Sequence, residues 1–219
     1  MKTMKALIVF LCFSLLIQLN AAQAQDQLFI VFLNTNPDRE QLDEDKVSAL
    51  QKGHLENIQR LYDKGELLLA GPFNGGGGVF VLKAGDLESA RELLSSDPAI
   101  SANRFRIETM PMQIDKGMIC TQEEPYDMIL FNFIHFTPVN LQGESHWSAK
   151  EAYDDREDVV FAFSYDDAHF VEVLNGESDA ESYADQHPLI QDKSYSYEIR
   201  PWLSTNKTFC NDKSKKLNY

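Results

Sequence analysis

The sequence predicts an α+β fold made of two ferredoxin-like βαββαβ units packed sheet to sheet. Two observations lead to this prediction. Residues 80–120 resemble residues 170–210 at a constant spacing, and the hydrophobic pattern alternates between strand and helix periods in the order βαββαβ. In that arrangement both helices cover one face of an antiparallel sheet. The opposite face also needs a cover, and a second copy of the same sheet is the natural one.

The internal similarity runs without a gap. Matched residues are ninety positions apart, as in Phe80 with Phe170 and Pro98 with Pro188. The copies differ at one polar position, where Asp97 of the first corresponds to His187 of the second. We therefore expect at most one polar site in the chain, in the first copy, with the second copy mainly completing the fold.

In the first unit, residues 26–112, each element has a local signal. Leu28–Leu33 is a continuous apolar run, typical of a strand buried on both faces. From Asp43 to Lys64 apolar residues recur at helical spacing, and Gly65 favours a stop. Asp86 can cap a second helix. The other strands are expected at 67–70, 79–82 and 105–109, with a glycine-rich turn at 75–78.

The second unit, residues 126–203, keeps most of these elements. Strands are expected at 128–136, 158–163, 169–174 and 195–199, and a helix at 178–186. The register loses eleven residues in the first helix, which leaves room only for a short helix around 148–154. Residues 113–125 are expected to link the units. Residues 204–219 are expected to form a mobile polar tail.

Residues 1–24 have the features of a secretory signal peptide. Lys2 and Lys5 precede the apolar run Ala6–Leu19, and Ala22-Gln23-Ala24 is a small-x-small cleavage site. The alternative, a membrane anchor, is disfavoured because the run is shorter than the ~20 residues that a bilayer span needs. The sequence therefore predicts a secreted or periplasmic protein that does not enter the membrane.

The chain is strongly acidic, with a formal net charge of −14. Removing residues 1–24 takes away two lysines, so 34 acidic side chains then face 18 basic ones and the charge becomes −16. Such a surface repels phosphate backbones and anionic lipids. Nucleic-acid binding and docking on a membrane are therefore not expected.

Two cysteines, Cys120 and Cys210, lie outside the leader, at matching positions of the two copies. An exported protein meets an oxidising compartment, so a disulfide between them is possible. Two free thiols are the alternative. No Cys/His spacing resembles a zinc site, and no metal or other cofactor is expected.

Two residues of the first unit could carry chemistry. His54 lies on the apolar stripe of its helix, next to Gly53, and Asp97 follows the second helix and precedes Pro98. Both helices lie on one face of the sheet, so the two side chains can meet. A carboxylate beside a histidine fixes its proton and its orientation, as a general base requires. The alternatives are a core histidine and an ordinary Asp-Pro turn.

Four elements in order resemble the YCII-related (YciI-like) domain family. They are His54-Leu55, the run Gly65-Glu66-Leu67-Leu68-Leu69-Ala70-Gly71-Pro72, then Gly78-Val79-Phe80-Val81, and Asp97-Pro98. The resemblance covers residues 26–112, and the second copy is degenerate because it lacks the Gly-Pro pair. It implies a dimeric α/β barrel, here within one chain, and a site built on His54 and Asp97. Gly71 and Pro72 would lie beside that site as ligand-binding residues.

These observations favour a protein that binds a small organic molecule in its first unit. If it is an enzyme, His54 would move a proton and Asp97 would orient it, in cofactor-free lyase, isomerase or dehalogenation-type elimination chemistry. The alternative is a non-catalytic ligand-binding or structural module. Because the two halves would satisfy each other, a monomer with pseudo-dimeric internal symmetry is expected.

Overall fold

The computed structural model describes residues 26–122, 124–139, 157–166, 168–210, 213–217 and 219. Its first half consists of β1 (Gln27–Thr35), α2 (Glu44–Asp63), β2 (Leu67–Pro72), β3 (Gly78–Ala84), α3 (Leu87–Ser95), α4 (Pro98–Ser101) and β4 (Phe105–Lys116). The main helix begins and ends as its sequence predicts. The Asp43 side chain accepts a hydrogen bond from the Lys46 amide, and Gly65 follows the helix with a φ of 71°.

The second half repeats the strand pattern with shorter helices. It consists of β5 (Met128–Pro138), β6 (Val159–Tyr165), β7 (His169–Asn175), α6 (Ala180–Asp185), α7 (Pro188–Gln191), β8 (Tyr195–Thr205) and the 3₁₀ turn η1 (Lys213–Lys215). The predicted signal peptide (1–24) and the predicted short helix at 148–154 lie outside the described residues. The helix expected at 178–186 is shorter, and the backbone turns again into α7 at Pro188.

All eight strands form one antiparallel sheet in the order β2-β3-β1-β4-β6-β7-β5-β8. Each half alone has its second, third, first and fourth strands side by side, which is the ferredoxin-like order. The halves join where β4 pairs with β6. The two edge strands also approach each other, because Phe73, just after β2, bridges to Trp202 of β8. The predicted fold class, a dimeric α/β barrel formed within one chain, is confirmed.

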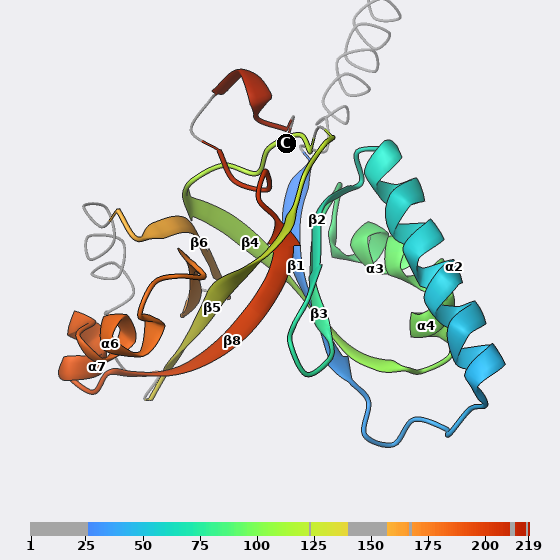
Figure 1. The fold of residues 1–219 in the computed structure, drawn as a ribbon, viewed down its shortest axis with the longest axis horizontal. Helices are drawn as coiled ribbons and strands as arrows, with labels where there is room; N and C mark the ends of the chain where they lie inside the picture. Colours follow the sequence, from blue (N-terminus) through green and yellow to red (C-terminus); the bar gives the residue numbers. More distant parts are fainter. Residues whose placement is uncertain (1–25, 123, 140–156, 167, 211–212, 218) are drawn as a thin grey trace, which may run out of the picture.

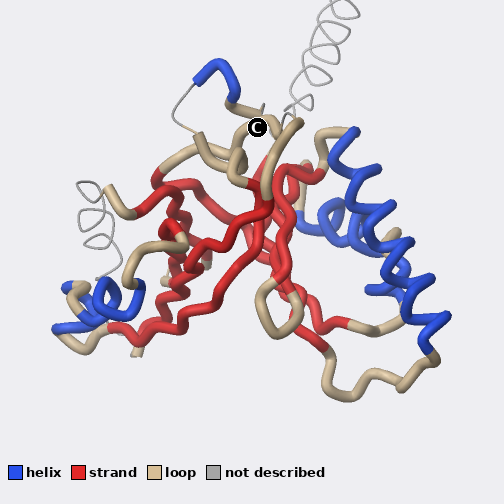
Figure 2. The backbone as a smooth tube through the Cα atoms, in the orientation of Figure 1, coloured by secondary structure: helices blue, strands red, loops and turns tan. Residues whose placement is uncertain are grey.

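Three hydrophobic clusters match this architecture. The central one lies between the two halves and is rich in aromatic side chains, including Phe32, Phe133, Phe163 and Trp202. One outer cluster lies under α2 and α3, and the other lies under α6 and α7. The helices accordingly lie on opposite outer sides of the molecule, with the strands between them (Figures 1 and 2). The sheet-to-sheet contact is therefore the main core.

The segments expected as a linker and a mobile tail are both structured. β4 continues to Lys116, because Met112 and Ile114 alternate with polar residues and pair with β6. The C-terminal segment packs back onto the chain through bridges from Ile119 to Phe209 and from Cys120 to Lys216. The Phe209 ring stacks on Phe161 in the central core. This aromatic anchor explains why the segment does not behave as the polar tail that its composition predicts.

Candidate functional site

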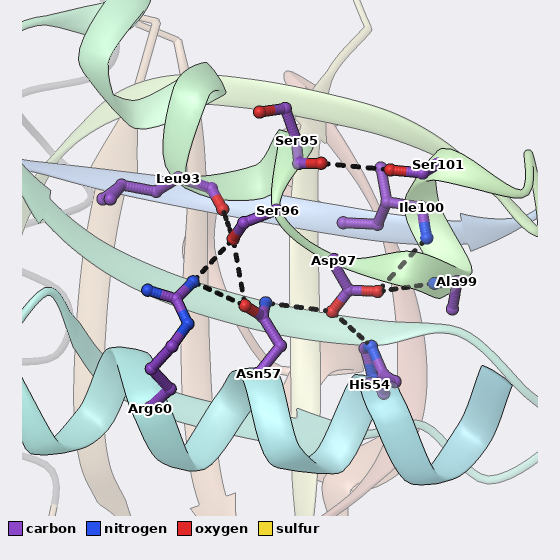
Figure 3. Close-up of polar contacts among 10 residues, drawn as sticks. All are labelled: His54, Asn57, Arg60, Leu93, Ser95, Ser96, Asp97, Ala99, Ile100 and Ser101. Carbon is purple, nitrogen blue, oxygen red and sulfur yellow. Dashed lines mark hydrogen bonds and ion pairs between the residues drawn. The ribbon is translucent and has the colours of Figure 1, made fainter. Parts of the chain in front are cut away.

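The structure brings His54 and Asp97 together. His54 lies on α2, Asp97 caps the first turn of α4, and the distance between His54 Nδ1 and Asp97 Oδ2 is 2.7 Å (Figure 3). The His54 side chain is 12% exposed and Asp97 is fully buried. The predicted residue pair is therefore one hydrogen-bonded unit, with only the histidine within reach of solvent.

The two carboxylate oxygens of Asp97 accept hydrogen bonds from different partners. Oδ1 accepts hydrogen bonds from the backbone amides of Ala99 and Ile100, which caps α4. Oδ2 faces His54 and also accepts a hydrogen bond from Asn57 Nδ2 at 3.2 Å. Burial by itself would raise the pKa of Asp97, but the hydrogen bond and charge of His54 and the two amides lower it below its ordinary value. Asp97 is thus an anion at neutral pH.

An ionised Asp97 fixes the tautomer of His54. A carboxylate only accepts hydrogen bonds, so the nitrogen facing it, Nδ1, carries the proton. In the neutral ring Nε2 then has a free lone pair and can accept a proton. The ring is also held flat against Phe80, with the ring centroids 5.8 Å apart, and contacts Phe105. The neutral ring of His54 is therefore held in the tautomer and orientation that a general base requires.

A second polar residue on α2, Asn57, was not singled out by sequence reasoning. Its side chain is buried, and its Oδ1 accepts a hydrogen bond from Arg60 Nη2 at 2.6 Å and from Ser96 Oγ at 2.9 Å. The spacing from His54 to Asn57 places both side chains on the same helix face, which is the signal that could have found it. The chain of contacts from Arg60 through Asn57 to Asp97 holds the carboxylate in place (Figure 3).

A cavity of about 460 Å³ opens beside His54, between α2 and the edge of β2. Its volume lies within the range of small-molecule sites. Gly71 and Pro72 line it, where the resemblance placed them. Gly71 also has a structural reason to be glycine, because a Cβ there would lie 2.3 Å from Trp202 Nε1. His54, Gly71 and Pro72 therefore line one cavity, and the fourth predicted residue, Asp97, is buried against His54.

The outer wall of this cavity comes from the segment between the halves. Gln122, Glu124, Tyr126 and Met128 line the cavity, together with Thr205 of β8. The Gln122 amide donates a hydrogen bond to the Tyr62 hydroxyl of α2 at 3.2 Å. Sequence reasoning treated this segment as a linker and missed its part in the site. The first half alone does not complete the cavity.

A disulfide joins Cys120 and Cys210, with their Cα atoms 6.1 Å apart. The next residue, Thr121, donates its amide proton to the Lys215 carbonyl at 2.9 Å. The disulfide and these backbone bonds attach the start of the cavity wall to the C-terminal segment. Of the two alternatives for the cysteines, the structure therefore contains the bridge.

The corresponding position of the second half has different chemistry. His187 caps α7, and its Nδ1 accepts a hydrogen bond from the Leu189 amide. Its Nε2 lies 3.8 Å from Glu172 Oε1, and the Tyr183 hydroxyl donates to Glu172 Oε2 at 2.7 Å. The second half thus has a buried polar cluster in place of a His–Asp pair.

The described part of the chain gives no metal site and no membrane span. Among these residues, no group of three or more His, Cys, Asp or Glu side chains is placed to hold a metal ion. No helix among them has the length and apolar character to cross a membrane.

Fold and site together define a single-chain dimeric α/β-barrel protein with a His–Asp pair beside a cavity of its first half. Residues 28–112 match the family model of the YCII-related domain. The match covers the residues around His54, Gly71-Pro72 and Asp97, on which the predicted resemblance to this family depends. The match ends at Met112, where β4 begins to pair with β6. That the second half is a degenerate copy of this domain remains a prediction.

Among solved structures, the chain is similar to the crystal structure of a "Putative monooxygenase" from Fusobacterium nucleatum subsp. nucleatum. The two chains share 11% sequence identity with a TM-score of 0.45, and the alignment covers 90% of this chain and 98% of the other. No curated protein matches the sequence.

Proposed function

We propose that the protein binds a small organic molecule in the cavity beside His54 and moves a proton on it without a cofactor. The observation that carries this proposal is the 2.7 Å contact between His54 and a buried, ionised Asp97 at the wall of a 460 Å³ cavity. A cavity with convergent polar groups and a carboxylate-oriented histidine is the usual arrangement for general base catalysis.

The chemistry follows from the hydrogen bonds. With Nδ1–H directed at Asp97, Nε2 of His54 accepts a proton from an acidic C–H or O–H group of the ligand. The Asp97 carboxylate then stabilises the imidazolium. Returning the proton to a different atom gives an isomerisation, and expelling a leaving group from the resulting anion gives an elimination. Such proton transfer typically contributes about 10²–10⁴-fold to the rate.

Isotope exchange tests this function directly. The protein is incubated in D₂O with a panel of small carbonyl compounds and phenols, and NMR follows loss of C–H signals. We expect exchange or turnover with the unaltered protein, and a decrease of about 10²–10⁴-fold in His54→Gln. Asp97→Asn should also slow exchange and should change its pH profile. His169→Gln, which alters a histidine outside the cavity, is the matched control and should keep full activity.

A non-catalytic ligand-binding role is the second candidate. The packing of His54 between Phe80 and Phe105 favours it, because a histidine so enclosed also serves as a core residue. In that case ligands would bind without proton exchange. His54→Gln would then lower the free energy of unfolding but would not change any reaction rate. If compounds bound saturably but none of them exchanged hydrogen for deuterium, the protein would be a ligand-binding protein and not an enzyme of this kind.

We also infer that the protein acts outside the cytoplasm as a monomer. The N-terminal sequence supports export, and the disulfide between Cys120 and Cys210 suits an oxidising compartment. The sheet faces that a separate partner would cover are already covered by the other half of the same chain. Fractionation of expressing cells and analytical ultracentrifugation test the two parts of this inference separately.

A further inference from the structure

The charge pattern around the cavity restricts what it can bind. In the described chain the cavity wall includes Glu124 but contains no lysine or arginine. Three basic residues of this half, Arg60, Lys64 and Lys83, line a separate hollow near the C-terminal end of α2, together with the acidic Asp26, Glu66 and Glu92. Ionised Asp97 lies directly beneath His54. The fixed charges nearest the cavity are therefore negative, on a chain that already has a net charge of −14.

The cavity mouth is unusually apolar for a surface. Three of its lining residues are among the exposed large hydrophobic side chains: Leu55 is 55% exposed, Met128 50% and Tyr126 42%. They come from α2, from the segment that joins the halves and from the first residue of β5, so they meet only in the folded chain. Further in, Leu67 and Leu69 of β2 add apolar surface. Exposed apolar groups gathered at a cavity commonly mark a binding site.

Among the described residues of the cavity wall, Glu124 carries the one fixed charge. Gln51, Gln59, Tyr62 and Gln122 can donate and accept hydrogen bonds, but none supplies a positive charge. A carboxylate or phosphate entering here would lose water without gaining an ion pair with a lysine or an arginine, and it would approach the carboxylates of Glu124 and Asp97. A neutral group loses less hydration free energy on entering, and a cationic group is attracted by the two carboxylates.

We propose that the ligand of the His54 cavity is an uncharged or cationic molecule with an apolar, ring-sized body, and that anionic metabolites are rejected. This inference rests on the proposed function, because it concerns the same site. It narrows the substrate to molecules such as phenols, neutral carbonyl compounds and amines. Carboxylic acids, phosphate esters and nucleotides are excluded as classes.

Three probes of nearly equal shape test the inference. The neutral 2-naphthylmethanol, the cationic 2-naphthylmethylamine and the anionic 2-naphthoate are titrated into the protein at pH 7.5. Calorimetry gives the affinities, and ¹⁵N-NMR shifts of residues 51–72 report where each probe binds. We expect the alcohol and the amine to bind at this site, and the naphthoate to bind at least tenfold more weakly than the alcohol. A smaller difference, or tighter naphthoate binding, overturns the inference.

Two variants assign the effect to the cavity. Gln122→Lys introduces a cation at the wall and should improve naphthoate binding at least threefold. Glu124→Gln should reduce the preference for the amine over the alcohol. Glu92→Gln, in the separate hollow that Arg60, Lys64 and Lys83 also line, is the matched control and should change neither affinity. Unchanged naphthoate binding in Gln122→Lys would contradict the charge argument.

Failure of this inference is distinguishable from failure of the proposed function. Strong naphthoate binding in the cavity would overturn the ligand class but would leave the His54–Asp97 site as a binding site. If none of the probes shifted the cavity residues, the apolar ligand class would also be wrong. The D₂O exchange experiment would still decide separately whether His54 moves a proton.

Discussion

A Cβ atom on Gly53 would lie 2.7 Å from Cγ of Pro98, so helix α2 and the start of α4 touch where only glycine fits. The neighbours of these two residues are His54 and Asp97. The close approach of the Pro98 ring to the backbone of α2 therefore accompanies the hydrogen-bond distance between the histidine and the carboxylate. A glycine within a helix costs about 1 kcal/mol relative to alanine, and here it permits the geometry of the site.

Gly53→Ala should consequently destabilise the protein. The higher helix propensity of alanine contributes about 1 kcal/mol, but overpacking against Pro98 costs about 1–3 kcal/mol. We expect a net loss of up to about 2 kcal/mol in urea unfolding, and a weaker His54–Asp97 hydrogen bond seen as a shift of the Nδ1 proton resonance. Ser48→Ala, on the exposed face of α2, is the control for helix propensity. If the Gly53→Ala protein were more stable than the parent, Pro98 would have to move away from the new methyl group at no cost in free energy.

Asn57→Leu tests the network that holds Asp97. The substitution keeps similar volume but removes the donor to Asp97 and the acceptor for Arg60 and Ser96. Buried polar groups left without partners cost about 1–3 kcal/mol, and we expect a loss of that size in unfolding free energy. Gln59→Ala removes an exposed hydrogen bond to Asp63 on the same helix and should cost much less. Equal effects of the two substitutions would mean that Asn57 has no special role.

The parts of the fold that depend on local chemistry were predictable. Asp43 and Gly65 mark the ends of α2 in the sequence and in the structure, since capping depends on near neighbours. The His54–Asp97 pair was predictable because the split βαβ topology places both helices on one face. The α4 turn was not predicted, because Asp-Pro begins a turn and a helix equally well, and Pro98 is its first residue.

The parts that depend on distant contacts were not predictable. Gln122 and Tyr126 lie in a segment with no strand or helix pattern, and only the folded chain shows that they wall the cavity. Phe209 is an isolated aromatic residue in a polar segment. Its partners, Phe131 and Phe161, lie on strands far away in the sequence. Neither position has a periodicity that sequence reasoning could use.

Removing the disulfide should lower stability substantially. Cys120 and Cys210 are 90 residues apart, and closing a loop of that length restricts the unfolded chain strongly. We expect the double variant Cys120→Ser, Cys210→Ser to lose about 2–4 kcal/mol in guanidinium unfolding. The unaltered protein with reductant should lose a similar amount, and reductant should not change the double variant. A variant as stable as the parent would show that the backbone bonds of this segment suffice.

His135, which does not line the cavity, gives the protein an acid-sensitive element. It lies on β5, its ring stacks on Phe32 with the centroids 5.7 Å apart, and its Nε2 is hydrogen-bonded to the Tyr165 hydroxyl. The pKa of His135 is lowered from an ordinary 6.5 to about 4, chiefly because the ring is buried; the nearby charges of His169 and Arg200 also lower it, and Asp166 opposes them. The folded protein therefore holds this ring neutral at pH values where an unfolded chain protonates it.

The sign of the pH effect follows from that difference. Between pH 6.5 and 4 the unfolded state binds a proton that the folded state does not, so stability falls as the pH is lowered. The full difference corresponds to roughly 3 kcal/mol, reached near pH 4 and absent above pH 7. His135→Gln keeps a polar partner for Tyr165 but does not titrate. We expect its urea-unfolding free energy to fall less steeply than that of the parent between pH 6.5 and 4, with parallel curves above pH 7. If both proteins lost stability equally over this range, the acid sensitivity would have to arise from other groups.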